Sequence, residues 1–163
     1  PTASCKAGIS LTVEKYARYA QVLEKTQWAG DFSWDHIRTI CRYVRPMSAK
    51  KGAVIFRQGD REESLGIIIR GEVDILKQGG GKAVKVATLK SSQTFGEMAL
   101  IDGEPRSATG IAAKDTIIFF LSKKGLLRLS EAHPKLGFKL LWKISKFISR
   151  HLRKTTGMLV DYM

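Results

Sequence analysis

The stretch FGEMALIDGEPRSA, residues 95–108, places a turn, a short apolar run and two opposite charges on one connection between strand-like segments. Gly96 lets the backbone turn without a steric penalty, and the EMALI that follows can form about one helical turn. The first N–H groups of such a turn lack a partner within the helix and favour an anion. Arg106 supplies a planar guanidinium that can donate to two phosphate oxygens at once. We therefore expect an anionic ligand here.

Glu97 narrows the class of ligand, because a carboxylate near a bound phosphate repels it unless the carboxylate faces a hydrogen-bond donor. A ribose hydroxyl is such a donor, so the acid and the base together predict a sugar and its phosphate held side by side. Ser107 adds a hydroxyl, and Ala108 adds a backbone N–H where the chain enters a strand. The alternative is an internal ion pair between Glu97 and Arg106, although a buried pair is often no better than apolar packing. A cyclic ribose phosphate satisfies the pattern.

Short strand-like segments flank this stretch on both sides. Turn residues such as Gly71 and the triplet Gly79-Gly80-Gly81 separate them. Many short strands with closely spaced turns predict an all-β barrel or jelly roll, which we place at residues 43–122. The segments are VIF at 54–56, LGIII at 65–69, VDIL at 73–76, AVKVATL at 83–89 and TIIFFL at 116–121.

Helical periodicity marks both ends of the chain. Apolar residues recur at helical spacing from Leu11 to Gln27, and Ser33 suits the N-cap of a second helix that ends at Cys41, so residues 1–42 form a predicted helical segment. After Pro134 a heptad seam runs through the predicted C-terminal helices of residues 123–163. Either the seam covers the barrel or it pairs two copies of the helix, and we favour a homodimer. The seam consists of Phe138, Leu141, Ser145, Ile148, Leu152, Thr155, Leu159 and Tyr162.

Composition limits the remaining classes of protein. The chain has 163 residues, of which 44% are apolar and 26% charged, and this mixture suits one compact domain. Neither a signal peptide nor a membrane-spanning run is evident, so we expect a cytoplasmic protein without a membrane partner. Cys5 and Cys41 lack metal-ligand spacing, and His36, His133 and His151 lie outside the strand-like region. We expect neither a metal site nor an enzyme.

FGEMAL followed by PRSA resembles the phosphate-binding cassette of the cyclic nucleotide-binding domain family, which includes catabolite activators, kinase regulatory subunits and gated channels. The resemblance extends upstream through GAVIFRQGDREESLGIIIRGEVDIL, residues 52–76, and covers about residues 33–155. It implies a mainly β fold: an eight-stranded jelly-roll barrel, or double-stranded β-helix, with N-terminal helices and a long C-terminal helix. It also implies a regulatory module in which the ligand shifts the position of the C-terminal helix.

The same resemblance implies roles within the cassette. Glu97 would accept a hydrogen bond from the ribose 2′-hydroxyl, and Arg106 would pair with the exocyclic phosphate oxygens. Ser107-Ala108 resembles the cyclic-AMP type of the family, so cyclic AMP is favoured over cyclic GMP. Thr155-Thr156 resembles the polar pair that caps the purine in the catabolite activators. The predicted ligand-binding residues are Phe95, Gly96, Glu97, Met98, Ala99, Arg106, Ser107, Ala108, Thr155 and Thr156.

The net charge of +13 leaves a second hypothesis open, because it favours anionic partners of any kind. Residues 120–154 hold ten Lys or Arg and one acid, Glu131. The alternative is a protein of the same fold that takes no ligand and uses its basic C-terminal helix to bind nucleic acid or an acidic partner. Sequence-specific DNA binding is not expected, since the catabolite activators follow this helix with a helix-turn-helix domain and the given chain ends at Met163.

Overall fold

Two helices precede the barrel in the computed structural model, which describes residues 3–162 and the side chains of residues 14–162. Helix α1 spans Ala3–Glu24, the 3-10 turn η1 spans Gln27–Asp31, and α2 spans Trp34–Cys41. Ser33 caps α2, because its side chain accepts a hydrogen bond from the backbone N–H of His36 at 3.2 Å. The second helix therefore lies where the sequence predicts it, whereas α1 begins earlier than expected.

Eight strands form two four-stranded sheets, which confirms the predicted jelly roll. One sheet has the order β1-β8-β3-β6 and the other β2-β7-β4-β5. The strands are β1 (Val44–Ala49), β2 (Val54–Phe56), β3 (Ser64–Arg70), β4 (Glu72–Gly79), β5 (Lys82–Lys90), β6 (Thr94–Phe95), β7 (Thr109–Ala112) and β8 (Thr116–Ser122). Five of them match the predicted segments, and β1, β6 and β7 were not predicted.

Strand β3 is buried on both of its faces and separates two apolar layers. Leu65 and Ile67 belong to the layer between the sheet and the helices, and Ile68 belongs to the layer inside the barrel. Because successive residues of a strand point to opposite faces, one continuous apolar run supplies both layers. We call these the helix-side layer and the inner layer.

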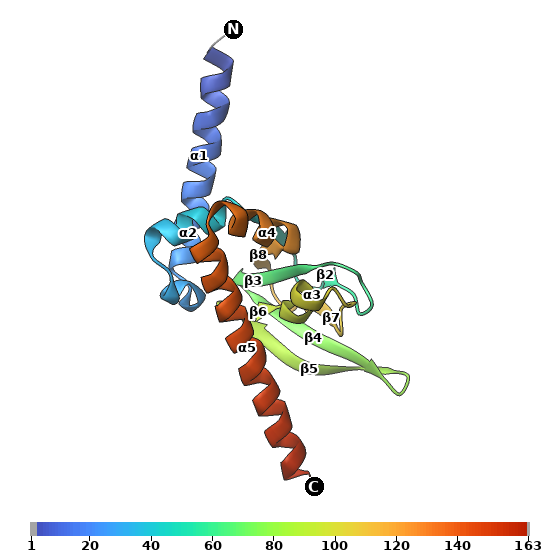
Figure 1. Ribbon diagram of the computed structural model, residues 1–163. Helices are drawn as coiled ribbons and strands as arrows, with labels where there is room; N and C mark the ends of the chain where they lie inside the picture. The colour runs from blue at the N-terminus through green and yellow to red at the C-terminus, as the bar shows by residue number, and fades with distance from the viewer. Residues whose placement is uncertain (1–2, 163) are drawn as a thin grey trace.

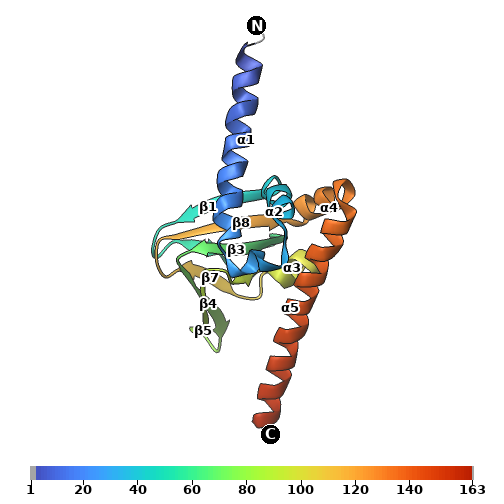
Figure 2. The same ribbon diagram turned by 90° about the vertical axis from the view of Figure 1, so that its left-hand side faces the viewer.

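Two C-terminal helices complete the fold. Helix α4 spans Lys123–Ala132, and α5 spans Pro134–Asp161 with Pro134 at its first turn, as the sequence predicts. The two helices pack closely, since a Cβ at Gly137 would lie 2.2 Å from Ser130 Oγ. The buried residues of α5 all lie in its first half, the last being Ile144. Figures 1 and 2 show α5 running along one side of the barrel and past its end, while α1 projects from the opposite end.

The basic face of α5 holds the helix against η1. Lys143 Nζ bonds to Asp31 Oδ2 and lies 5.5 Å from the ring centroid of Trp28. Lys139 Nζ lies 5.4 Å from the ring centroid of Phe32. Such cation–π contacts contribute about 0.5–2 kcal/mol each. Lys139 and Lys143 are therefore packing residues as well as charges of the basic C-terminal helix.

The described residues offer neither a membrane span nor a metal cage. None of the helices within residues 3–162 combines the length and the apolar character that crossing a bilayer requires. Among the side chains of residues 14–162, His, Cys, Asp and Glu form no group of three or more suited to a metal ion. Cys41 lies in the helix-side layer, where burial raises the pKa of its thiol to about 12. The side chain of Cys5 is outside the described residues.

Three phenylalanine rings fill the inner layer. The ring centroids of Phe56 and Phe95 are 4.9 Å apart in a stacked pair, and Phe120 meets Phe95 edge-on at 5.7 Å. Glycines make room for them: a Cβ at Gly66 would lie 2.2 Å from Phe95, and one at Gly110 would lie 2.3 Å from Phe56. The rings of Phe56 and Phe95 thus require glycine on the strands beside them.

We expect Gly110→Ala to destabilise the fold by about 1–3 kcal/mol, because the added methyl group collides with the Phe56 ring inside a closed layer. Gly79→Ala is the matched control, since Gly79 also lies in a strand but its Cβ would meet nothing within 4 Å. Urea unfolding of both variants measures the difference. Equal midpoints for the two variants would contradict the packing described for Phe56.

Candidate functional site

The predicted phosphate-binding stretch forms a compact turn of helix between β6 and β7. Helix α3 spans Glu97–Asp102, with Gly96 at its N-cap and Gly103 at its C-cap. Both glycines have a left-handed backbone, with φ of 83° and 70° respectively. At Gly96 space is also short, because a Cβ would lie 2.0 Å from Arg106 Nη1 and 2.4 Å from the Ser64 carbonyl oxygen. Gly96 is therefore required both for its φ and for the approach of Arg106.

Arg106 lies inside the protein, where 4% of its surface remains exposed. Its Nη2 donates to Ser64 Oγ at 3.0 Å, and its guanidinium carbon lies 5.1 Å from the ring centroid of Phe56. The backbone is fixed on both sides, because Arg106 N–H donates to the Asp60 carbonyl and Gly59 N–H donates to the Arg106 carbonyl, each at 2.8 Å. The loop between β2 and β3 thus closes over the arginine.

The guanidinium of Arg106 is under-satisfied. Its Nε and Nη1 are buried without a hydrogen-bond partner. Burial lowers the pKa of Arg106, while Glu62, Glu97 and Asp60 oppose that shift by their charges. A buried polar group without a partner costs about 1–3 kcal/mol, and more when it is charged. Two nitrogens of the buried guanidinium therefore still lack an acceptor.

Glu97 is the second buried charge of the site, with 8% of its surface exposed. Its Oε1 accepts a hydrogen bond from the hydroxyl of Thr94. Burial raises the pKa of the Glu97 carboxyl, and the bond from Thr94 and the charges of His151 and Arg106 oppose that rise. The carboxylate is thus held by one hydroxyl in a poorly solvated position.

The two charged groups are neighbours that bond to separate hydroxyl groups. Among residues 14–162, neither Glu97 nor Arg106 takes part in an ion pair within 4.0 Å. The internal salt bridge that the sequence left open is therefore not formed. An acceptor can reach the unpaired nitrogens of Arg106 without first breaking a bond between the two side chains.

Residues 46–133, more than half of the chain, match the family model described as the cyclic nucleotide-binding domain. The chain belongs to the cyclic nucleotide-binding domain family. The family resemblance read from residues 52–76 and 95–108 is thereby confirmed.

Several characterised proteins are similar to this member of the family. The cAMP-dependent protein kinase regulatory subunit of Dictyostelium discoideum is 30% identical over 151 residues, which cover 90% of this chain and 46% of that protein. The cyclic AMP receptor protein of Thermus thermophilus is 31% identical over 105 residues, covering 64% of this chain and 47% of that protein. The chain therefore spans about half the length of these relatives.

Solved structures share the fold. A cyclic nucleotide-binding domain from Methylobacillus flagellatus superposes with a TM-score of 0.78 and 27% identity, covering 93% of this chain and 85% of that one. The catabolite activator protein of Thermus thermophilus superposes with a TM-score of 0.74 and 26% identity, covering 83% of this chain and 62% of that one. These superpositions support the eight-stranded jelly roll with a long C-terminal helix.

The remaining predicted residues of this cyclic nucleotide-binding domain divide into two groups. Phe95 and Ala99 are buried around the cassette, Met98 and Ser107 are exposed, and Ala108 is half-buried. Thr155 and Thr156 lie elsewhere, in the second half of α5. Their side chains are exposed, and their hydroxyls donate to the carbonyls of His151 and Leu152 at 3.0 and 2.9 Å. The structure does not bring this pair to the cassette, and its role in binding stays a prediction.

Three residues of the site were not predicted from the sequence. Ser64 and Thr94 provide the hydroxyls that hold Arg106 and Glu97, and Phe56 provides the ring beneath the guanidinium. Thr94 stands directly before the FGEMAL motif and could have been included by proximity. Ser64 and Phe56 lie on strands distant in sequence, and the sequence carries no signal that places them beside Arg106.

We expect the stability advantage of Glu97→Gln over the wild-type protein to grow as pH rises. The folded protein keeps a proton on Glu97 at pH values where the unfolded chain has lost it, because burial raises the pKa of the folded carboxyl. The protonated carboxyl of Glu97 thus contributes stability to the wild-type protein at low pH, and this contribution is lost as pH rises through the raised pKa. Gln cannot ionise and retains an oxygen for Thr94.

Thermal unfolding from about pH 4 to pH 8 measures this dependence, since that range begins near the ordinary pKa of a glutamate. Glu104→Gln is the control, because Glu104 lies in the same stretch but is exposed. An advantage that shrinks with rising pH would mean that the charges of Arg106 and His151 outweigh burial at Glu97.

Proposed function

We propose that this chain is a regulatory module that binds cyclic AMP at residues 95–108 and makes or breaks no covalent bond. The observation that carries the proposal is the buried guanidinium of Arg106 with two unpaired nitrogens beside the backbone of Gly96. A phosphate diester offers two oxygens that can accept charge-assisted hydrogen bonds from guanidinium N–H groups. Relatives named for cyclic AMP, a kinase regulatory subunit and a receptor protein, support the same ligand.

The other groups of the cassette fit a ribose phosphate. Glu97 would exchange part of its bonding to Thr94 for the 2′-hydroxyl of the ribose, which is a donor. Ser107 is exposed and free to turn its hydroxyl toward the phosphate. The sequence Ser107-Ala108 favours cyclic AMP over cyclic GMP within the family. The cassette thus offers a hydrogen-bond acceptor to the 2′-hydroxyl and hydrogen-bond donors to the phosphate.

Binding requires the site to open, because Arg106 is almost fully covered. The β2–β3 loop holds Arg106 through the carbonyl of Asp60 and the hydroxyl of Ser64. Helix α3 packs against β3 on one side and approaches α5 on the other. A ligand that separates α3 from this loop therefore displaces the surface against which α5 rests. We propose that residues 43–122 bind the nucleotide and that residues 123–163 change position in response, as a shift between two populated states.

Removing the guanidinium tests the ligand assignment. We expect Arg106→Ala to weaken cyclic AMP binding by about 2–5 kcal/mol, the cost of losing one partner of a buried charged contact. Arg106→Lys should recover part of the loss, because it restores the charge but not the two-pronged geometry. Isothermal titration calorimetry with cyclic AMP and cyclic GMP gives both affinities, and thermal unfolding confirms that each variant is folded.

Arg61→Ala is the control for lost charge, because Arg61 is exposed and lies in the loop that covers Arg106. It should change the affinity for cyclic AMP by less than about 1 kcal/mol, as expected for an exposed charge. If folded Arg106→Ala binds cyclic AMP as tightly as the wild-type protein does, Arg106 is not the phosphate ligand.

We further propose that the module forms a homodimer through the heptad seam of α5. The seam contains large apolar side chains that the monomer leaves in solvent: Phe138 is 66% exposed, Leu152 65% and Leu159 61%. The seam is adjacent to the buried face of α5 on the helix surface and distinct from the basic face that meets η1. A second α5 packed on the seam would remove these side chains from water.

We expect Leu152→Glu to convert the dimer to a monomer, because it places two like charges opposite each other across the helix pair. Val160→Glu is the matched control: Val160 is also 65% exposed and lies on α5, but it is not part of the seam. Sedimentation velocity at several protein concentrations measures the change. Equal dissociation in the two variants, or a monomeric wild-type protein, would contradict the proposed interface.

A further inference from the structure

A cavity lies outside the barrel, between α5, η1 and the β5–β6 connection. Its volume is about 260 Å³, close to the lower end of small-molecule sites. Trp28, Leu65 and Ile144 line it, and all three belong to the helix-side layer. The residues of the inner layer and Arg106 are not among those that line it. The cavity therefore stands on the opposite side of the sheet from the guanidinium of the cassette.

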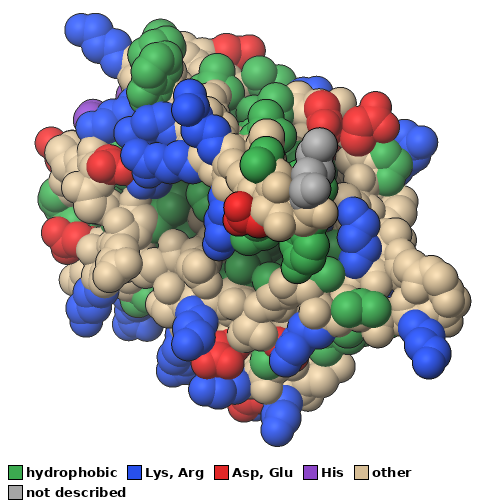
Figure 3. All heavy atoms as spheres, turned by 90° about the horizontal axis from the view of Figure 1, so that it is seen from below, with side chains coloured by type: hydrophobic (Ala, Val, Ile, Leu, Met, Phe, Trp, Pro, Cys, Tyr) green, Lys and Arg blue, Asp and Glu red, His purple; other side chains and the backbone are tan. Residues whose placement is uncertain are grey.

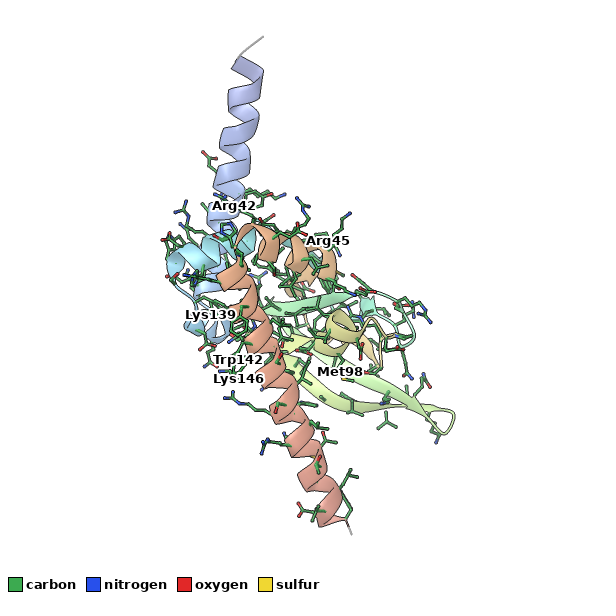
Figure 4. All side chains as sticks on the ribbon, in the orientation of Figure 1. Arg42, Arg45, Met98, Lys139, Trp142 and Lys146 are labelled. Atoms are coloured by element: carbon green, nitrogen blue, oxygen red, sulfur yellow. The ribbon has the colours of Figure 1, made fainter. Side chains whose placement is uncertain are left out.

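The α5 wall of this cavity is basic. Lys143, Lys146, Phe147 and Arg150 line it at intervals of three and four residues, which places them on one face of the helix. Lys143 is already bonded to Asp31. Lys146 and Arg150 form no ion pair with any acid among residues 14–162. Figure 4 shows Lys146 on α5 and Met98 on α3, the helix that begins at Glu97. Figure 3 shows Lys and Arg side chains spread over much of the face that is seen from below.

The opposite wall is polar and conformationally strained. Ser92, which lines the cavity, has φ of 73°, the one positive φ among the described residues that are not glycine. Its hydroxyl accepts from Gln27 N–H at 2.9 Å, and its N–H donates to the Ile68 carbonyl at 2.8 Å. Strained residues of this kind concentrate at binding sites. Gln93 and Glu97 add an amide and a carboxylate to the same wall.

We propose that this cavity is a second binding site, which takes a small amphipathic anion. The apolar or planar body of the ligand packs between Trp28 and Phe147, and its phosphate or carboxylate group is held by Lys146 and Arg150. A hydroxyl or N–H on the body meets the side chain of Gln93. The inference does not rest on cyclic AMP binding at the cassette, because Arg106 takes no part in it.

Such a site would be linked to the cassette by its shared wall. Glu97 begins α3 and lines the cavity, while α5 forms the other side. A ligand in the cavity contacts α5 and η1 at once, so it favours the α5 position described here over any position in which the two separate. The second ligand then changes the affinity of the cassette without occupying it.

Phenyl phosphate is a suitable probe, since it combines a planar ring with a dianion. In ¹H–¹⁵N spectra of the full chain, the indole N–H of Trp28 should shift and saturate with a dissociation constant of about a millimolar or below, as expected for a ligand of this size. Trp34 and Trp142 do not line the cavity, and their indole signals serve as internal controls. An unchanged Trp28 signal overturns the proposal.

Two double variants separate a formed site from general attraction to a basic protein. Lys146→Gln with Arg150→Gln should weaken phenyl phosphate binding about tenfold or more, because both charge-assisted bonds are lost. Lys135→Gln with Arg153→Gln removes the same charge from exposed positions of α5 outside the cavity and should change affinity less than about twofold. All four positions are exposed, so we expect both double variants to fold. The dispersion of the same ¹H–¹⁵N spectra verifies this. Equal weakening by the two variants overturns the proposal.

Added cyclic AMP distinguishes this cavity from the cassette. If the two sites are separate, the apparent dissociation constant of phenyl phosphate reaches a plateau as cyclic AMP is increased. An apparent constant that rises in proportion to cyclic AMP, without limit, means competition for one site and overturns the proposal. If cyclic AMP has no effect because the cassette does not bind it, the pair of double variants still decides whether the cavity binds the probe.

Discussion

A charged guanidinium, buried with fewer hydrogen bonds than it can make, governs the arrangement of this domain. Arg106 is surrounded by the ring of Phe56, the hydroxyl of Ser64 and the backbone of Gly96, and this environment satisfies it incompletely. Replacing a buried charged group with apolar side chains of similar volume often stabilises a protein. Keeping Arg106 at this position therefore costs stability, which other contacts of the fold offset. Gly96 and Gly110 follow from it, because one admits the guanidinium and the other admits the ring beneath it.

The sequence predicts the helical turn of the cassette and five of the eight strands, but it does not predict the contacts made between distant segments. Strands β2 and β8 are recognisable in the sequence as runs of apolar residues that are β-branched or aromatic. Strand β6 has two residues, and β1 contains Arg45 and Pro46, so neither shows a period that could be recognised. The sequence shows the heptad seam and the basic character of α5. The contact of Lys143 with Trp28 depends on where η1 lies, which the sequence does not show. Tertiary packing decided these features.

Helix α5 has three faces with different surroundings. One face, ending at Ile144, is buried against α4 and the sheet. A second face carries lysines that lie over the aromatic rings of η1 and its neighbour Phe32. The third, with Phe138 and Leu152, is exposed. The last buried residue of α5 is Ile144, and Ile148 packs in part against the helix-side layer. Intramolecular packing therefore fixes the part of α5 near the barrel and not its C-terminal turns.

The second half of α5 therefore depends on its own residues for helical structure. Thr155, Thr156 and Gly157 follow one another there, and all three are poor helix formers; a Cβ at Gly157 would meet nothing within 4 Å. A few turns of such sequence without tertiary packing are marginal in water. Association of these turns with another surface would thus be coupled to their winding, and the pairing would show a large negative heat-capacity change and an enthalpy that becomes more favourable as temperature rises.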